Sequence, residues 1–145
     1  MNEEWKALIL DHYKHPRFYG PKEDFAFASE QHNRTCGDHV KVFASLEGKF
    51  SQWSFVGAGC SLCLASASLM MELLQNQTKD AVEAIRDENR SMWDGGIDFE
   101  TASRPLWQAL DGLRQYPVRS RCVKLAWQAL DEILVSWNSL DISIA

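Results

Sequence analysis

The chain has 145 residues and a formal net charge of −5; apolar residues make up 46% of it and charged residues 24%. This length corresponds to one domain that buries a core without disulfide or metal staples, and the composition excludes a disordered chain. No apolar run approaches the roughly 20 residues that span a bilayer, and no secretory signal opens the sequence. The acidic balance argues against nucleic-acid binding driven by overall charge.

The first half of the chain changes from helical to strand periodicity. Apolar side chains recur at helical spacing over residues 3–15, which predicts an amphipathic helix. Residues 25–28, 40–46 and 50–56 alternate with period two, which predicts three short antiparallel strands. Glu47-Gly48 is the expected hairpin turn between the last two strands.

The second half is mainly helical. Two adjacent apolar rows follow Gly57-Ala58-Gly59 and predict a largely buried helix that begins at Cys60. The later elements are a helix at 78–88 with Thr78 as its N-cap, a polar loop at 89–99, a weak helix at 100–113 and a helix at 119–137.

These elements predict an α+β fold, with a small three-stranded antiparallel sheet and helices packed on one face and at one end. We expect a single domain over residues 1–145, in which residues 138–145 form a frayed tail.

The chain contains four cysteines, Cys36, Cys60, Cys63 and Cys122. Without a secretory signal we expect a cytoplasmic protein, in which thiols stay reduced. Four reduced thiols indicate core packing, metal binding or redox chemistry, and the sequence pattern must decide among these.

Three of these cysteines lie where a predicted element begins. Cys36 precedes a strand, Cys60 opens a helix, and Cys122 opens the last helix. A thiol at a helix N-terminus lies at the positive end of the helix dipole, which favours the thiolate. Arg121 and Lys124 add positive charge near Cys122. Because thiolate is both a nucleophile and a soft metal ligand, this setting suits either role.

Asp38 lies two residues after Cys36, so on an extended chain the two side chains point the same way. Three thiolates and this carboxylate make a four-coordinate set for zinc or for an iron–sulfur cluster. The spacing is not that of a zinc finger, and Cys60-Ser61-Leu62-Cys63 lacks the second CxxC of a zinc ribbon.

Four motifs occur in the order of one protein family. They are Ile-Leu-Asp-His-Tyr-Lys-His-Pro-Arg at 9–17, Thr-Cys-Gly-Asp at 35–38, Gly-Ala-Gly-Cys-Ser and Ala-Ser-Ala-Ser within 57–68, and Arg-Cys-Val-Lys-Leu-Ala-Trp-Gln-Ala-Leu at 121–130. Through these motifs the chain resembles the NifU N-terminal/IscU/SufU family of iron–sulfur cluster assembly proteins. The resemblance extends from about residue 3 to residue 137.

Within this family the chain is most similar to the SufU branch. The stretch between Cys60 and Cys122 is long, as in SufU. Arg121 precedes Cys122 where the IscU branch carries a histidine ligand, and the Leu-Pro-Pro-Val-Lys segment that IscU proteins offer to their chaperone is absent.

The resemblance implies a function and a site. Cys36, Asp38, Cys60 and Cys122 would be the ligands, of zinc in the SufU branch or of a [2Fe–2S] cluster in a scaffold. Cys36 would accept persulfide sulfur from a SufS-like, PLP-dependent cysteine desulfurase. The chain would pass that sulfur to other iron–sulfur assembly proteins, acting at most as a sulfurtransferase partner.

Two alternatives stay open beside sulfur relay: a scaffold that assembles and transfers a [2Fe–2S] cluster, and a structural zinc module without sulfur traffic. Cys63 departs from the family pattern, because a small or aliphatic residue is more usual there. It is either a further thiol at the site or an ordinary buried cysteine, and we favour burial. His39 adjoins the predicted site and is the one histidine retained as a candidate ligand.

Overall fold

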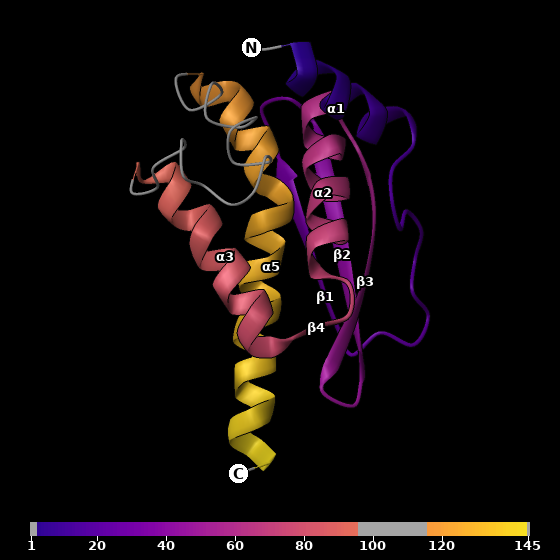
Figure 1. Cartoon of the computed structure of the whole chain (residues 1–145), viewed down its shortest axis with the longest axis vertical. Coiled ribbons are helices and arrows are strands. Elements are labelled where there is room, and N and C mark those ends of the chain that lie inside the picture. The colour runs from indigo at the N-terminus through magenta and orange to yellow at the C-terminus, as the bar shows by residue number, and fades with distance from the viewer. Residues whose placement is uncertain (1–2, 96–115, 145) are drawn as a thin grey trace.

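The computed structural model describes residues 3–95 and 116–144 (Figure 1). The elements in chain order are α1 (Glu3–Lys14), β1 (Phe27–Asn33), β2 (Asp38–Glu47), β3 (Phe50–Ala58), α2 (Ser61–Leu74), β4 (Gln77–Thr78), α3 (Lys79–Trp93) and α5 (Pro117–Ile144). The strands form one sheet in the order β1-β2-β3-β4, and every neighbouring pair is antiparallel.

The helices lie in two layers against this sheet. Helices α2 and α5 pack on one face of it, α1 packs against α2, and α3 packs against α5 (Figure 1). The predicted α+β class, an antiparallel sheet with packed helices, is confirmed. None of the helices in the described ranges is long and apolar enough to cross a membrane.

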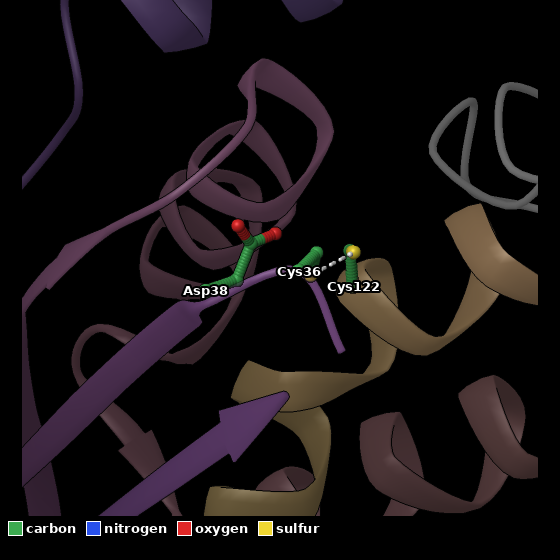
Figure 2. A group of neighbouring side chains, drawn as sticks. All are labelled: Cys36, Asp38 and Cys122. Atoms are coloured by element: carbon green, nitrogen blue, oxygen red, sulfur yellow. Dashed lines mark hydrogen bonds between the residues drawn. The ribbon is translucent and has the colours of Figure 1, made fainter. Parts of the chain in front are cut away.

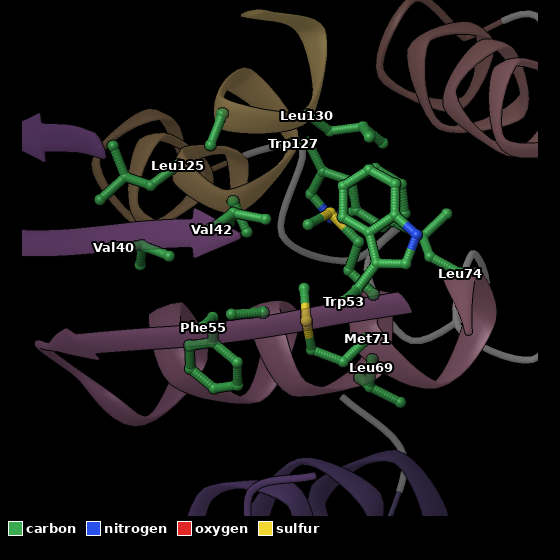
Figure 3. Close-up of a cluster of buried hydrophobic side chains, with 14 of the residues drawn as sticks. Val40, Val42, Trp53, Phe55, Leu69, Met71, Leu74, Leu125, Trp127 and Leu130 are labelled. Atoms are coloured by element: carbon green, nitrogen blue, oxygen red, sulfur yellow. The ribbon is translucent and has the colours of Figure 1, made fainter. Parts of the chain in front are cut away.

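The core fills the space between the sheet and the two helices that cover it. Trp53 and Phe55 of β3 meet Met71 of α2 and Leu130 of α5 there, and all four side chains are almost fully buried (Figure 3). Apolar burial of this kind contributes about 25 cal/mol per Å². This burial stabilises the packing of β3 against α2 and α5; Cys60 is the N-cap of α2 and Cys122 lies on α5.

The first strand lies later in the chain than predicted. Alternating apolar residues place it at 25–28, whereas β1 spans Phe27–Asn33. The inward side chains of β1 include Ser29 and Asn33, which are buried and hydrogen bonded to Glu132 and Cys122 of α5. An apolar pattern alone does not detect a strand whose buried face is polar and hydrogen bonded.

The sheet contains one strand that the sequence does not predict. The two-residue strand β4 pairs with the start of β3 and leads directly into α3. The hairpin turn between β2 and β3 consists of Gly48 and Lys49, one residue later than predicted, and Gly48 has a φ of +63° that suits glycine.

The helix boundaries differ from the prediction at three places. Thr78 caps α3 as expected, but α3 continues to Trp93, so the predicted loop at 89–99 is wrong for residues 89–93. Pro117 is the first residue of α5, a position at which proline is favoured. Helix α5 also continues through residues 138–144, where a frayed tail is predicted. The predicted helix at 100–113 lies outside the described residues.

Candidate metal centre

The hairpin between β1 and β2 carries the first two predicted ligands. Asn33 and Asp38 are its last paired residues, and the four residues between them form the turn. Gly37 has a φ of +76°, and its N–H donates to the Asn33 carbonyl at 2.8 Å. The Asn33 side chain accepts from the Thr35 N–H at 3.1 Å, which tightens the turn. Cys36 is exposed on this turn.

Asp38 opens β2 and its side chain is buried, with 4% exposure. Its Oδ1 accepts from the backbone N–H of Cys60 at 3.3 Å. Its Oδ2 is buried and has no hydrogen-bond partner in the described part of the chain. A carboxylate oxygen in this position costs free energy unless a cation or a donor meets it.

Cys122 reaches the same place from α5. Its Sγ lies 3.3 Å from the Cys36 Sγ, and it accepts from the Asn33 side-chain amide at 3.6 Å. Figure 2 shows Cys36 on the turn, Asp38 at the start of β2 and Cys122 on α5 facing one another. The β1–β2 hairpin and α5, which are far apart in the sequence, thus bring their side chains to one point.

The ligand atoms of Cys36, Asp38 and Cys122 all lie within 4.8 Å of one another. Two thiolates on a tetrahedral zinc ion lie roughly 3.8 Å apart, given Zn–S bonds of about 2.3 Å. The observed 3.3 Å between the two sulfurs is close to that separation. The unpartnered Asp38 oxygen and the paired sulfurs therefore fit a soft metal ion or an iron–sulfur cluster.

Cys60 lies beside this group but is not one of its three members. It is the N-cap residue of α2 and is exposed, and its side chain makes no capping hydrogen bond. Its backbone N–H binds Asp38, so the residue is held next to the centre while its sulfur stays available. The full set of four predicted ligands remains a prediction.

The surroundings of Cys122 differ from the prediction. Helix α5 begins at Pro117, so Cys122 lies more than one turn inside the helix and does not open it. Arg121 is exposed, and the Lys124 ammonium lies 4.7 Å from the centre of the Trp93 ring. In the metal-free chain, burial first, and then the neighbouring Asp38 and Cys36 side chains, raise the pKa of the Cys122 thiol, which opposes the predicted thiolate.

Two further residues change the site inferred from sequence. His39 follows Asp38 on a strand, so its side chain points to the opposite face of the sheet, where it stacks on His32. It is therefore not part of the centre. Asn33 was missed, although it binds both the turn and Cys122. Its signal was an asparagine at the start of a turn that contains a glycine.

Comparison with protein families decides the identity of the fold. The family described as NifU-like N terminal domain matches residues 4–122. The chain belongs to this NifU/IscU/SufU family.

Relatives and solved structures agree with this membership. The chain is 30% identical to "Zinc-dependent sulfurtransferase SufU" of Bacillus subtilis, over 88% of this chain and 87% of that protein. It is 31% identical to "Iron-sulfur cluster assembly scaffold protein IscU" of Streptococcus pyogenes, over 92% of this chain and 84% of that protein. A crystal structure of a putative iron–sulfur cluster assembly scaffold protein for the SUF system from Fervidobacterium islandicum has a TM-score of 0.77, at 29% identity, and covers 92% of this chain and 96% of that one.

Metal binding at this NifU-like centre is predicted to release protons. The raised pKa of Cys122 keeps its thiol protonated at neutral pH in the metal-free chain, and only the thiolate is a ligand. Apparent zinc affinity should therefore rise with pH, by roughly tenfold per pH unit for each proton released. Calorimetric zinc titrations in buffers of different ionisation enthalpy measure the number of protons released per zinc ion. A zinc affinity that does not change with pH would contradict proton release.

Cys63 is buried with 1% exposure, as the sequence predicts. Burial first, and then the negative charges of Asp38, Cys60 and Cys36, raise the pKa of its thiol to about 12. Its side chain packs in the hydrophobic core, and its sulfur is not among the ligand atoms that meet at the centre. Cys63→Ala should thus leave zinc stoichiometry and affinity unchanged, as measured by competition with a chelator; loss of the metal would make Cys63 a ligand.

Gly59 is predicted to control the position of Asp38. A Cβ at residue 59 would lie 2.7 Å from the Asp38 Cγ, well inside contact distance. Gly59→Ala should displace the carboxylate and weaken zinc binding by roughly 10- to 100-fold, the usual loss when a ligand's support is removed. Ala58→Gly, at an exposed neighbour, is the control. Equal affinity of both variants and the wild type would refute this role.

Proposed function

We propose that this protein is an iron–sulfur cluster assembly protein that accepts sulfur on Cys36 from a cysteine desulfurase, as a zinc protein of the SufU type. The observation that carries the proposal is the group formed by Cys36, Asp38 and Cys122, with two sulfurs 3.3 Å apart beside a buried, unpartnered carboxylate oxygen. Such a group holds a reactive thiol and a metal ion at one place.

Cys36, Asp38, Cys60 and Cys122 would hold the zinc ion. Zinc would keep these thiols together, ionised and protected from oxidation. Support for zinc comes from the relative named a zinc-dependent sulfurtransferase and from Arg121, which stands where the IscU branch carries a histidine ligand. The sequence identities to the SufU and IscU relatives are nearly equal and do not separate the two branches. The choice of the SufU branch therefore depends on Arg121.

Cys36 is the acceptor that its surroundings favour. It is exposed on a hairpin turn, whereas Cys122 and Cys63 are buried. Cys60 is exposed as well, but it is fixed as the N-cap of α2 and tied to Asp38 through its backbone. A partner enzyme therefore reaches Cys36 with the least rearrangement.

The transfer is a thiol–disulfide type exchange. The Cys36 thiolate attacks the outer sulfur of the desulfurase persulfide, and a new S–S bond forms on Cys36. The S–S bond on the enzyme breaks, and the enzyme cysteine leaves as a thiolate that takes up a proton. No net oxidation occurs, because one persulfide is consumed for each one formed.

The test combines the purified protein with a PLP-dependent cysteine desulfurase and its substrate cysteine. We expect faster cysteine turnover when the protein is added, and a mass increase of one sulfur atom on the peptide that contains Cys36. Unchanged turnover together with an unmodified peptide would overturn sulfur acceptance.

A scaffold function is the second candidate, favoured by the carboxylate within the ligand group and by relatives named IscU scaffolds. A carboxylate would make a bound [2Fe–2S] cluster labile enough to transfer. For a scaffold, Asp38→Ala should make a reconstituted cluster persist longer against a chelator, as followed by its visible absorption. An unchanged cluster lifetime would count against the scaffold.

A further inference from the structure

A second group of metal-ligating side chains lies on the opposite face of the same hairpin. His32 and His39 are directly paired across β1 and β2, and Glu30 is the next outward residue on β1. Helices α2 and α5 cover the other face, which carries Asp38. These three outward side chains play no part in the centre described above.

The ligand atoms of His32 and Glu30 already lie as far apart as two ligands of one metal ion. The His32 Nε2 lies 3.2 Å from the Glu30 Oε1. Two ligands with bonds of about 2.1 Å, at adjacent positions around one ion, lie roughly 3.0–3.4 Å apart. The chelating pair is therefore preformed, and with 57% and 45% exposure both side chains are open to an incoming ion.

His39 supplies the third ligand from the neighbouring strand. The rings of His32 and His39 are stacked with their centroids 5.6 Å apart, and directly paired positions have Cβ atoms about 4.5–5.5 Å apart. The stacked rings do not yet converge on one point, so uptake of an ion requires the His39 ring to turn about its Cα–Cβ bond. Both strands are held by a complete ladder, which keeps the two residues in register.

In the described part of the chain, the ion-pair partner of the Glu30 carboxylate is His32 of the same group. Lys41 is paired with Glu30 across the strands, but its ammonium lies 5.2 Å from the centre of the Phe43 ring. Arg34 lines a hollow of about 320 Å³ that His32 and Asp38 also line. The lining of this hollow thus includes one residue of the outer group, His32, and one of the thiolate centre, Asp38.

We propose that Glu30, His32 and His39 form a second metal site, which takes a divalent first-row transition-metal ion beside the thiolate centre. Two imidazoles and one carboxylate suit iron(II), nickel, copper or zinc and leave positions open to water or to an exchanging ligand. The site binds more weakly than a thiolate centre does, because it is exposed and offers three protein ligands.

Nickel titration of the untagged full chain tests this second site. The protein is first dialysed against a chelator, which removes loosely bound metal and leaves tightly bound metal in the thiolate centre. Ni²⁺ is then added in a calorimeter. We expect one further ion per chain without new thiolate-to-nickel absorption bands. His32→Ala and His39→Ala should each weaken this event by at least roughly tenfold, and the double variant should abolish it.

His15→Ala is the matched control, since His15 is exposed outside the group. It should bind Ni²⁺ like the wild type, and far-UV circular dichroism should show that every variant is folded. The proposal is overturned if the wild type takes up no further ion, or if the His32 and His39 variants bind it unchanged. Because no sulfur transfer is measured, failure of the proposed function does not alter this result.

Discussion

Cys36→Ser should abolish sulfur acceptance from the desulfurase. A serine hydroxyl cannot form a persulfide, and Cys36 is the exposed thiol on the turn that faces Cys122. We expect no sulfur atom added anywhere on the variant, as measured by mass spectrometry after incubation with desulfurase and cysteine. The variant should still fold, because Cys36 lies on a turn outside the core.

Cys63→Ser is the matched control for this variant. It makes the same chemical change at a thiol that is buried and hard to ionise. It should accept sulfur at the wild-type rate if it remains folded, which a thermal melt establishes. Full acceptance by the Cys36 variant would move the acceptor to another cysteine.

Asp38→Asn should change metal binding and stability in opposite directions. In the metal-free chain it removes a buried charge whose Oδ2 has no partner, while an acceptor for the Cys60 N–H remains. We expect the free energy of unfolding of the metal-free protein to rise by about 1–3 kcal/mol, because a charged carboxylate costs more to bury than a neutral amide. Zinc affinity should fall by at least roughly tenfold, because a ligand is lost.

Denaturant unfolding of the metal-free protein and competition for zinc with a chelator measure the two effects. Asp24→Asn, at an exposed carboxylate, is the control and should change neither. A metal-free Asp38→Asn protein that is less stable than the wild type would show that the carboxylate serves the fold rather than the metal.

The sequence predicts the parts of the centre that local patterns determine. The sequence placed Cys36 and Asp38 together on an extended segment at the start of a strand, whereas Cys36 lies on a turn and Asp38 opens β2. The apolar rows after Gly59 placed Cys60 at a helix start and Cys63 in the core. Each of these depends on a few neighbouring residues, so periodicity and turn chemistry are sufficient to predict it.

Long-range contacts determine what the sequence does not predict. Asn33 and Ser29 lie on the buried face of β1 only because α5 supplies hydrogen-bond partners for them. Cys122 is buried because α5 packs against the rest of the core, and this burial raises the pKa of its thiol. The position of His39 was predictable, since strand alternation from Asp38 already puts it on the opposite face.

Metal content and the visible absorption spectrum of the protein purified without oxygen test the central claim most directly. We predict nearly one zinc ion per chain and no visible absorption bands, because zinc has a filled d shell. Iron with inorganic sulfide and a brown chromophore would contradict the zinc-bound sulfur acceptor and would make the scaffold the function of this centre.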